Sequence, residues 1–192
     1  MRITGGEWRG RSLEGPKASG GTITRPTTDK VRQALFNSLS SLVGSLEGLR
    51  VLDCFAGTGA LSFEALSRGA DHAVMTEVDR HALRAIKSNI ANLDCADCVT
   101  VRGGNTFELS AKNLHNHSFD VAFLDPPYSF QPADIAGLLV SLAQADALSL
   151  GAIIVYEYDQ HSRFEPPEGF ALIKEKEYGS THVTYLRYEG VS

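Results

Sequence analysis

The sequence predicts an α/β fold built on a mostly parallel, seven-stranded sheet, with an antiparallel hairpin at its C-terminal end. Three observations lead to this prediction. From residue 50 onward, short apolar runs alternate with stretches of helical periodicity, which is typical of a parallel sheet covered on both faces. A glycine-containing turn directly follows the first apolar run. Near the C-terminus, two further runs are separated only by Gly179 and Ser180, which favours a tight antiparallel turn.

The apolar runs and the helical periodicity locate the individual elements. We expect parallel strands at 50–54, 73–77, 99–102, 120–124 and 152–158, and hairpin strands at 171–178 and 181–188. We expect helices at 60–68, 80–92 and 133–144. A first helix is expected to begin at Thr27 or Thr28, because either hydroxyl can cap a helix that starts just after Pro26.

The first 25 residues differ in composition from the rest of the chain. They are rich in Gly, Ser and Thr, and Ile3, Trp8 and Leu13 are the only large apolar residues between Met1 and Lys17. We therefore expect a short hairpin or arm over residues 1–25 that lies outside the core, and a main domain over residues 26–192.

Charge is distributed unevenly along the chain. The formal net charge is -5, but residues 1–32 carry seven Lys or Arg against three acids, a local balance of +4 that leaves -9 for the remainder. Phosphate contacts depend on local charge, so a basic N-terminal arm is compatible with docking to a polyanion. The alternative is a solvated, flexible chain end. The residues expected to contact a nucleic acid are Arg2, Trp8, Arg9, Arg11, Arg25, Thr27, Lys30 and Arg32.

Composition argues against a membrane protein, a secreted protein and a metal-binding protein. A chain of 192 residues with 43% hydrophobic content is expected to form one core. No apolar stretch approaches the roughly 20 residues of a membrane helix, and no signal peptide is recognisable, so we expect a cytoplasmic protein and, by default, a monomer. The three cysteines indicate a reducing compartment. Cys95 and Cys98 have the spacing of a redox or zinc site, but they have no second pair nearby, so we expect ordinary cysteines and no metal.

The turn from Asp53 to Gly59 is the first candidate binding site. Gly57 and Gly59 permit a ligand to approach the backbone closely. Ser62 stands where a dinucleotide fingerprint would have its third glycine, so the turn suits a nucleoside better than a pyrophosphate. Asp53 at the strand end can accept hydrogen bonds from an ammonium group, directly or through water.

Glu77 ends the second predicted strand and is the second candidate. It follows Gly57 by twenty residues, and a carboxylate at this spacing can accept hydrogen bonds from both hydroxyls of a ribose. The adjacent Val78 is placed to contact a purine. The alternatives are structural: any strand-to-helix turn can contain two glycines, and an acid can cap the helix that begins near Arg80. The joint spacing favours a nucleoside site.

The residues from Asp125 to Tyr128 follow the fourth predicted strand. The consecutive prolines Pro126 and Pro127 remove two backbone donors, which leaves the Asp125 carboxylate and nearby carbonyls as acceptors for a planar amine. Tyr128 offers a ring on which a base can stack. The alternative interpretation is an ordinary proline-rich turn.

Together these features resemble the S-adenosylmethionine-dependent amino methyltransferases, a class with a Rossmann-like fold. Three further segments resemble the RsmD family of 16S rRNA guanine-N2 methyltransferases. They are ITGGEWRGR at 3–11, RPTTDKVR at 25–32 and ALSRGA at 65–70. The resemblance extends from the N-terminus through Tyr128, whereas the remaining residues match the family in outline only.

The resemblance implies transfer of a methyl group to the exocyclic N2 amine of a guanine that is flipped out of its stack. It implies 16S rRNA, within a small-subunit particle, as the substrate. Catalytic roles are implied for Asp125, Pro126, Pro127 and Tyr128. Cofactor contacts are implied for Asp53, Phe55, Ala56, Gly57, Thr58, Gly59, Glu77, Val78, Asp79, Asn105, Thr106 and Asp125.

One position departs from the family pattern. The family commonly has Gly-Asp after the third strand, where the acid accepts from the adenine amine, whereas Gly104 is followed here by Asn105. An amide oxygen can also accept that bond. Other functions remain open from the sequence: methylation of an adenine or cytosine amine in DNA, a dinucleotide-dependent oxidoreductase, and a nucleotide- or RNA-binding assembly factor without catalysis.

Overall fold

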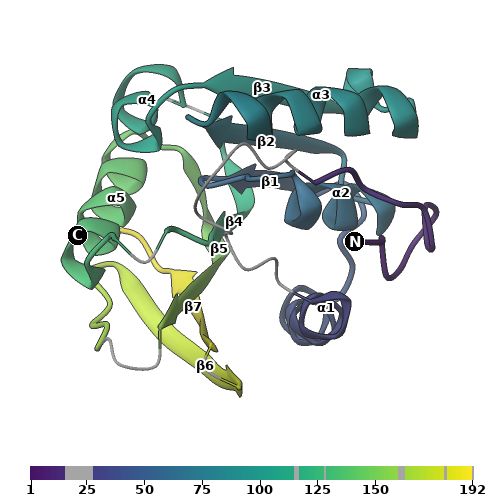
Figure 1. Ribbon diagram of the computed structural model, residues 1–192. Helices are drawn as coiled ribbons and strands as arrows, with labels where there is room; N and C mark the ends of the chain where they lie inside the picture. The colour runs from purple at the N-terminus through teal and green to yellow at the C-terminus, as the bar shows by residue number, and fades with distance from the viewer. Residues whose placement is uncertain (16–27, 115–116, 128, 160–162, 180, 192) are drawn as a thin grey trace.

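The computed structural model describes residues 1–15, 28–114, 117–127, 129–159, 163–179 and 181–191. Within them the strands form one seven-stranded sheet in the order β3-β2-β1-β4-β5-β7-β6 (Figure 1). The strands are β1 (Arg50–Asp53), β2 (His72–Glu77), β3 (Val99–Gly103), β4 (Phe119–Leu124), β5 (Leu148–Asp159), β6 (Phe170–Tyr178) and β7 (Thr181–Tyr188). The first five are parallel, and β7 runs antiparallel between β5 and β6. The predicted fold class is therefore confirmed.

The structure contains the predicted helices and two short ones that were not predicted. They are α1 (Asp29–Val43), α2 (Ala60–Ser67), α3 (Arg80–Leu93), α4 (Thr106–Asn113) and α5 (Pro132–Gln144), with a short 3-10 helix at Ala96–Cys98. The sequence analysis did not predict α4 or the 3-10 helix. Helix α4 has only eight residues and few apolar ones, so it lacks the long periodic pattern on which helix prediction depends.

Helices cover both faces of the sheet (Figure 1). Adjacent residues of a strand point to opposite faces, so Val51 of β1 packs in the core beneath α1, α2 and α3 while Leu52 packs in the core beneath α4 and α5. The same alternation continues in β4, where Val121 and Phe123 belong to the first core and Ala122 to the second. Burial on both faces explains why the central strands are continuous apolar runs.

Helix α1 begins where the sequence predicted. Thr28 has an extended backbone and its hydroxyl accepts a hydrogen bond from the Val31 N–H at 3.3 Å, which makes it the N-cap. Thr27, the other candidate, lies outside the described residues.

The N-terminal segment forms the expected hairpin-like pairing but is not separate from the core. Arg2 and Ser12 form an antiparallel bridge, and the Gly10 N–H donates to the Ile3 carbonyl at 2.9 Å. Ile3 and Leu13 are nevertheless only 2% and 4% exposed and belong to the core under α1 and α2. The prediction that this segment lies outside the core is therefore wrong for these two residues, because both apolar side chains have a hydrophobic surface to cover. The proposed boundary at residue 25 lies outside the described residues.

Within the described residues, no helix combines the length and the apolar character needed to cross a membrane.

Candidate active site

Three carboxylates meet at the edge of the sheet where the parallel strands end. Asp53 is the last residue of β1, Glu77 is the last residue of β2, and Asp125 directly follows β4. Because β1 lies between β2 and β4, these three side chains come from neighbouring strands. Parallel α/β sheets bind their ligands at this edge.

The Asp53 side chain is buried, with only 1% of the residue exposed. Its Oδ2 accepts a hydrogen bond from the Ser62 hydroxyl at 2.9 Å, whereas Oδ1 has no hydrogen-bond partner among the described residues. Burial, opposed by the hydrogen bond from Ser62 and helped by the neighbouring Asp125 and Glu77 carboxylates, raises the pKa of Asp53 to about 7. Burial also raises the pKa of Asp125 to about 6.

This geometry fits a cationic ligand. A buried carboxylate oxygen without a partner is costly, and an ammonium group that donates to it would remove that cost. A positive ligand would also lower the repulsion between the carboxylates of Asp53, Glu77 and Asp125. S-adenosylmethionine carries both an ammonium and a sulfonium charge, so the carboxylate acceptors at this edge suit it.

The turn between β1 and α2 requires glycine for two different reasons. Gly59 has φ +79°, and a Cβ placed there would lie 2.5 Å from the Phe63 ring and 3.1 Å from the Met75 sulfur. Gly57 has φ +55°, and a Cβ there would meet no atom within 4 Å. Gly59 is thus fixed by packing beneath the turn, whereas Gly57 borders open space, as an approach to a ligand requires.

Glu77 holds this turn in place. Its Oε2 accepts from the Gly57 N–H at 2.7 Å, and its Oε1 accepts from the N–H groups of Val78 and Asp79 at 2.7 and 2.8 Å. A carboxylate has about four acceptor sites, so these three bonds leave room for about one ribose hydroxyl unless an amide is displaced.

Val78 and Asp79 occupy the connection between β2 and α3. Val78 is 65% exposed, which leaves an apolar surface available to a purine. Asp79 is the N-cap of α3, where its Oδ1 accepts from the N–H groups of His81 and Ala82, both at 2.8 Å. Its demonstrated role is therefore a helix cap.

Asn105 and Thr106 begin α4. The Asn105 side chain is the N-cap of this helix, and its Oδ1 accepts from the Phe107 N–H at 3.1 Å. Asn105 is exposed, so its amide remains accessible to a ligand, whereas Thr106 is only 3% exposed. The burial of Thr106 leaves its side chain little surface for a ligand.

The segment after β4 begins with Asp125 and the two prolines. Asp125 and Pro126 are half-buried and Pro127 is exposed. The Pro127 carbonyl accepts from the Phe130 N–H at 3.0 Å, which folds the segment back on itself. Tyr128, the predicted stacking residue, lies outside the described residues.

An aromatic cluster that the sequence analysis did not identify borders this segment. Phe55 follows β1, Phe107 lies in the first turn of α4, and Phe130 lies between β4 and α5; their ring centroids lie 5.2 to 6.1 Å apart. All three pack against the core beneath α4 and α5. The rings therefore join the turn after β1, the start of α4 and the segment after Asp125 into one apolar wall. Their position within a few residues of Asp53, Asn105 and Tyr128 is a signal that could have identified them.

The predicted nucleic-acid contacts divide into two groups. Arg2, Arg9, Arg11 and Lys30 are exposed. Trp8 is half-buried against the core, and its backbone N–H donates to the Ser67 hydroxyl at 2.9 Å. Arg25 and Thr27 lie outside the described residues.

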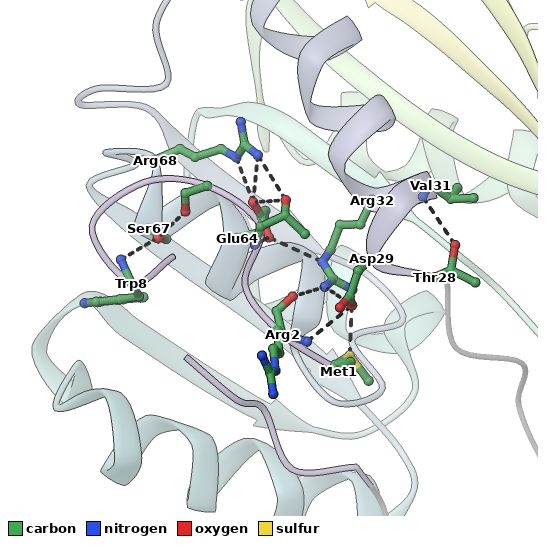
Figure 2. A network of polar contacts seen from close by, with 12 residues as sticks. Met1, Arg2, Trp8, Thr28, Asp29, Val31, Arg32, Glu64, Ser67 and Arg68 are labelled. Carbon is green, nitrogen blue, oxygen red and sulfur yellow. Dashed lines mark hydrogen bonds and ion pairs between the residues drawn. The ribbon is translucent and has the colours of Figure 1, made fainter. Parts of the chain in front are cut away.

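Arg32 requires a correction. Figure 2 shows its guanidinium between Glu64 and Asp29, where Nε lies 3.3 Å from Glu64 and Nη2 lies 2.8 Å from Asp29. The Arg32 side chain is only 1% exposed, and it also donates to the Arg2 carbonyl. A guanidinium enclosed in this way has no surface for a phosphate, so the prediction that Arg32 contacts a nucleic acid is wrong in this structure. Its role is to bind α1 to α2 and to the N-terminal segment.

Glu64 is the centre of the same buried network. Its carboxylate accepts from the Thr4 N–H at 2.8 Å and from the Thr4 hydroxyl at 2.7 Å, and it pairs with Arg68 as well as with Arg32. One carboxylate on α2 thus fixes the start of the chain beside the helix that follows the candidate cofactor turn.

Cys95 and Cys98 are free thiols. Burial raises the pKa of Cys95 to about 12 and also raises that of Cys98. Both groups are therefore protonated at neutral pH, which fits the predicted packing role.

Known proteins match this chain over nearly its whole length. The family described as conserved hypothetical protein 95 matches residues 1–187. The ribosomal RNA small subunit methyltransferase D of Haemophilus influenzae is 35% identical over 190 residues, covering 98% of this chain and 93% of the relative. The Bacillus subtilis protein YlbH, described as a candidate rRNA methyltransferase, is 36% identical over 99% of this chain and 100% of its own.

Solved structures show the same fold. The Escherichia coli protein yhhF, described as a candidate methyltransferase, superposes with a TM-score of 0.83 at 31% identity and covers 98% of both chains. More distant methyltransferases share the fold, including one solved in complex with SAH at a TM-score of 0.67 and 15% identity. The relatives of 35% and 36% identity that are named as rRNA methyltransferases support S-adenosylmethionine as the cofactor.

Proposed function

Because the chain belongs to the RsmD family, described as conserved hypothetical protein 95, we propose that it transfers a methyl group from S-adenosylmethionine to the exocyclic N2 amine of a guanine in 16S rRNA. Relatives named as rRNA small subunit methyltransferases support rRNA methylation. The choice of the guanine N2 amine rests on the resemblance of the segments at 3–11, 25–32 and 65–70 to the RsmD family.

The observation that carries this proposal is the group of three carboxylates at the sheet edge. The partnerless Oδ1 of Asp53 would accept from the ammonium of the cofactor, and Glu77 would accept from its ribose. Val78 would cover one face of the adenine, and Asn105 would accept from its amine. When bound, the cofactor supplies an electrophilic methyl group, so the protein needs only to position the acceptor amine and remove one proton.

Asp125 would perform both tasks. Its carboxylate and the Pro126 carbonyl would accept the two amine hydrogens and hold the nitrogen lone pair toward the methyl carbon. Formation of the N–C bond and cleavage of the C–S bond leave one proton to be released. The raised pKa of Asp125, about 6, makes this carboxylate a suitable acceptor for it. Tyr128 would stack on the flipped base.

The exposed cations of the N-terminal segment would dock the RNA. Arg2, Arg9 and Arg11 lie on a segment whose Met1 sulfur is 3.7 Å from the Thr58 hydroxyl, within the cofactor turn. The start of the segment therefore lies beside the proposed site, whereas Arg11 donates to the Asn92 carbonyl near the C-terminal end of α3. Phosphate contacts along the segment would orient the RNA so that the base reaches Asp125. We further propose that the protein acts in the cytoplasm as a monomer and that its substrate is a small-subunit particle rather than naked rRNA.

The test is methyl transfer onto small-subunit particles from a strain that lacks this protein. Particles are incubated with the purified protein and labelled S-adenosylmethionine, and the rRNA is digested for nucleoside mass spectrometry. The proposal expects N2-methylguanosine as the labelled product. Label in N6-methyladenosine or a methylcytidine, or no label in rRNA, would contradict it.

A further inference from the structure

Helix α3 presents one polar residue on its buried face. Ala82, Ala85, Ile86 and Leu93 of this face are apolar, whereas Asn89 is an amide that is 0% exposed. A buried amide destabilises a fold unless its donors and acceptor are satisfied, so the partners of Asn89 identify what this position does.

Those partners lie in two segments far apart in the sequence. Asn89 Oδ1 accepts from the Glu14 N–H at 2.7 Å, and Nδ2 donates to the Glu14 carbonyl at 3.1 Å and to the Thr58 carbonyl at 3.2 Å. The oxygen faces one donor and the nitrogen faces two acceptors, so the partners fix the orientation of the amide. Asn89 therefore links the end of the described N-terminal segment to the middle of the cofactor turn.

The other end of the same segment reaches the same residue. The Thr58 hydroxyl donates to the Met1 sulfur at 3.7 Å. Thr58 is thus contacted by Met1 directly and by Glu14 through Asn89. Between these points the hairpin-like pairing and the Glu64 network hold residues 1–14 as one unit.

We propose that Asn89 is a positioning residue that couples cofactor binding to the docking of residues 1–14. A cofactor that orders the turn fixes the Thr58 carbonyl, which orients the Asn89 amide and holds the Glu14 backbone. The consequence for RNA, that a bound cofactor places Arg9 and Arg11 for the substrate, rests on the proposed function. Coupling of this kind is reciprocal, so RNA bound to the segment strengthens cofactor binding by the same factor.

Hydrogen exchange of the whole protein tests the coupling without RNA. Exchange of backbone amides in residues 1–14 and 56–59 is measured with and without saturating S-adenosylhomocysteine, the product of the proposed transfer. In the unsubstituted protein we expect this ligand to slow exchange in both segments, by at least about fivefold in residues 1–14.

Asn89→Asp removes the Nδ2 donor while keeping an acceptor for Glu14. We expect the ligand still to protect residues 56–59 in this variant but to leave residues 1–14 unchanged. Asn37→Asp makes the same chemical change at an exposed position of α1 and serves as the matched control. Should the buried carboxylate prevent folding, as judged by circular dichroism, Asn89→Ser supplies a small polar group that is too short to span the two segments.

The second measurement is the affinity for small-subunit particles with and without S-adenosylhomocysteine. We expect the ligand to tighten particle binding in the unsubstituted protein and in Asn37→Asp, and to have no effect in the Asn89 variants.

The outcomes separate the two proposals. Equal protection of residues 1–14 in the Asn89 variants, or none in the unsubstituted protein that binds the ligand, overturns the coupling alone. Coupled protection without methylation of the particles overturns the proposed substrate alone. If S-adenosylhomocysteine does not bind, both proposals are wrong.

Discussion

The Gly57 N–H donates a hydrogen bond to Glu77 Oε2 across 2.7 Å, which joins the turn after β1 to the end of β2. Since Glu77 also accepts from two further backbone N–H groups, three donors converge on one side chain. The carboxylate is thus both a structural support of the turn and the proposed ribose acceptor.

Glu77→Gln should weaken binding of S-adenosylhomocysteine by at least about tenfold, or about 1.4 kcal/mol, because an amide NH₂ would face an N–H donor of the turn. Titration calorimetry measures the affinity. Glu47→Gln, an exposed position, should bind the ligand as the unsubstituted protein does. Equal affinity of the Glu77 variant would remove both roles assigned to this residue.

Asp125→Ala should retain the fold and the affinity for S-adenosylmethionine but lose turnover by at least about 100-fold, because the amine acceptor is no longer positioned. Transfer of labelled methyl groups to small-subunit particles measures the rate, and calorimetry measures binding. A variant with full turnover would show that Asp125 does not orient the amine.

Binding of S-adenosylmethionine should strengthen between about pH 5.5 and about pH 7.5, because its ammonium group pairs with the ionised carboxylate of Asp53, whose pKa is raised to about 7. The ligand favours the deprotonated form, so binding near pH 6.5 should release protons. Calorimetry in buffers of different ionisation enthalpy detects that release. Asp53→Asn should release fewer protons, whereas the exposed Asp146→Asn should behave as the unsubstituted protein.

Arg32→Met should lower the free energy of unfolding by about 3 kcal/mol, because Glu64 and Asp29 lose a buried partner. Denaturant unfolding measures the loss. The salt dependence of RNA binding by the folded variant should not change, since Arg32 contacts no phosphate. A smaller salt slope would restore the nucleic-acid role that its burial contradicts.

Replacing Arg9 and Arg11 together with Gln should weaken RNA binding and reduce its salt slope by about two, with little effect on cofactor affinity. Lys176→Gln with Arg187→Gln removes the same charge from exposed positions of the C-terminal hairpin and is the control. Fluorescence anisotropy over a range of salt concentrations measures both. An identical slope in the two double variants would exclude a specific role for the N-terminal arginines.

The sheet was predictable because its central strands are buried on both faces and so appear as continuous apolar runs. Strand β5 begins earlier than predicted, at Leu148, because the irregular pairing between Phe119 and Val121 lets it start before the apolar run at 152. Such a register shift depends on the neighbouring strand and leaves no local signal.

The carboxylates were predictable because each stands at the end of a predicted strand. Arg32 was not, since a charged residue near a basic terminus is ordinarily exposed and its partner Glu64 lies 32 residues away. The role of Asn89 was not predictable either, because it depends on hydrogen bonds with Glu14 and Thr58, which are distant in the sequence. Both roles arise from tertiary contacts.

The partners of the N-terminal segment have a consequence for synthesis on the ribosome. Thr4 forms its hydrogen bond with Glu64, which lies 60 residues later, and Glu14 forms its hydrogen bond with Asn89, which lies 75 residues later. Residues 1–14 therefore cannot form these contacts until α2 and α3 have left the exit tunnel. During translation residues 1–14 lack these tertiary contacts while the following residues are synthesised. Their arginines can bind a nearby polyanion during that time.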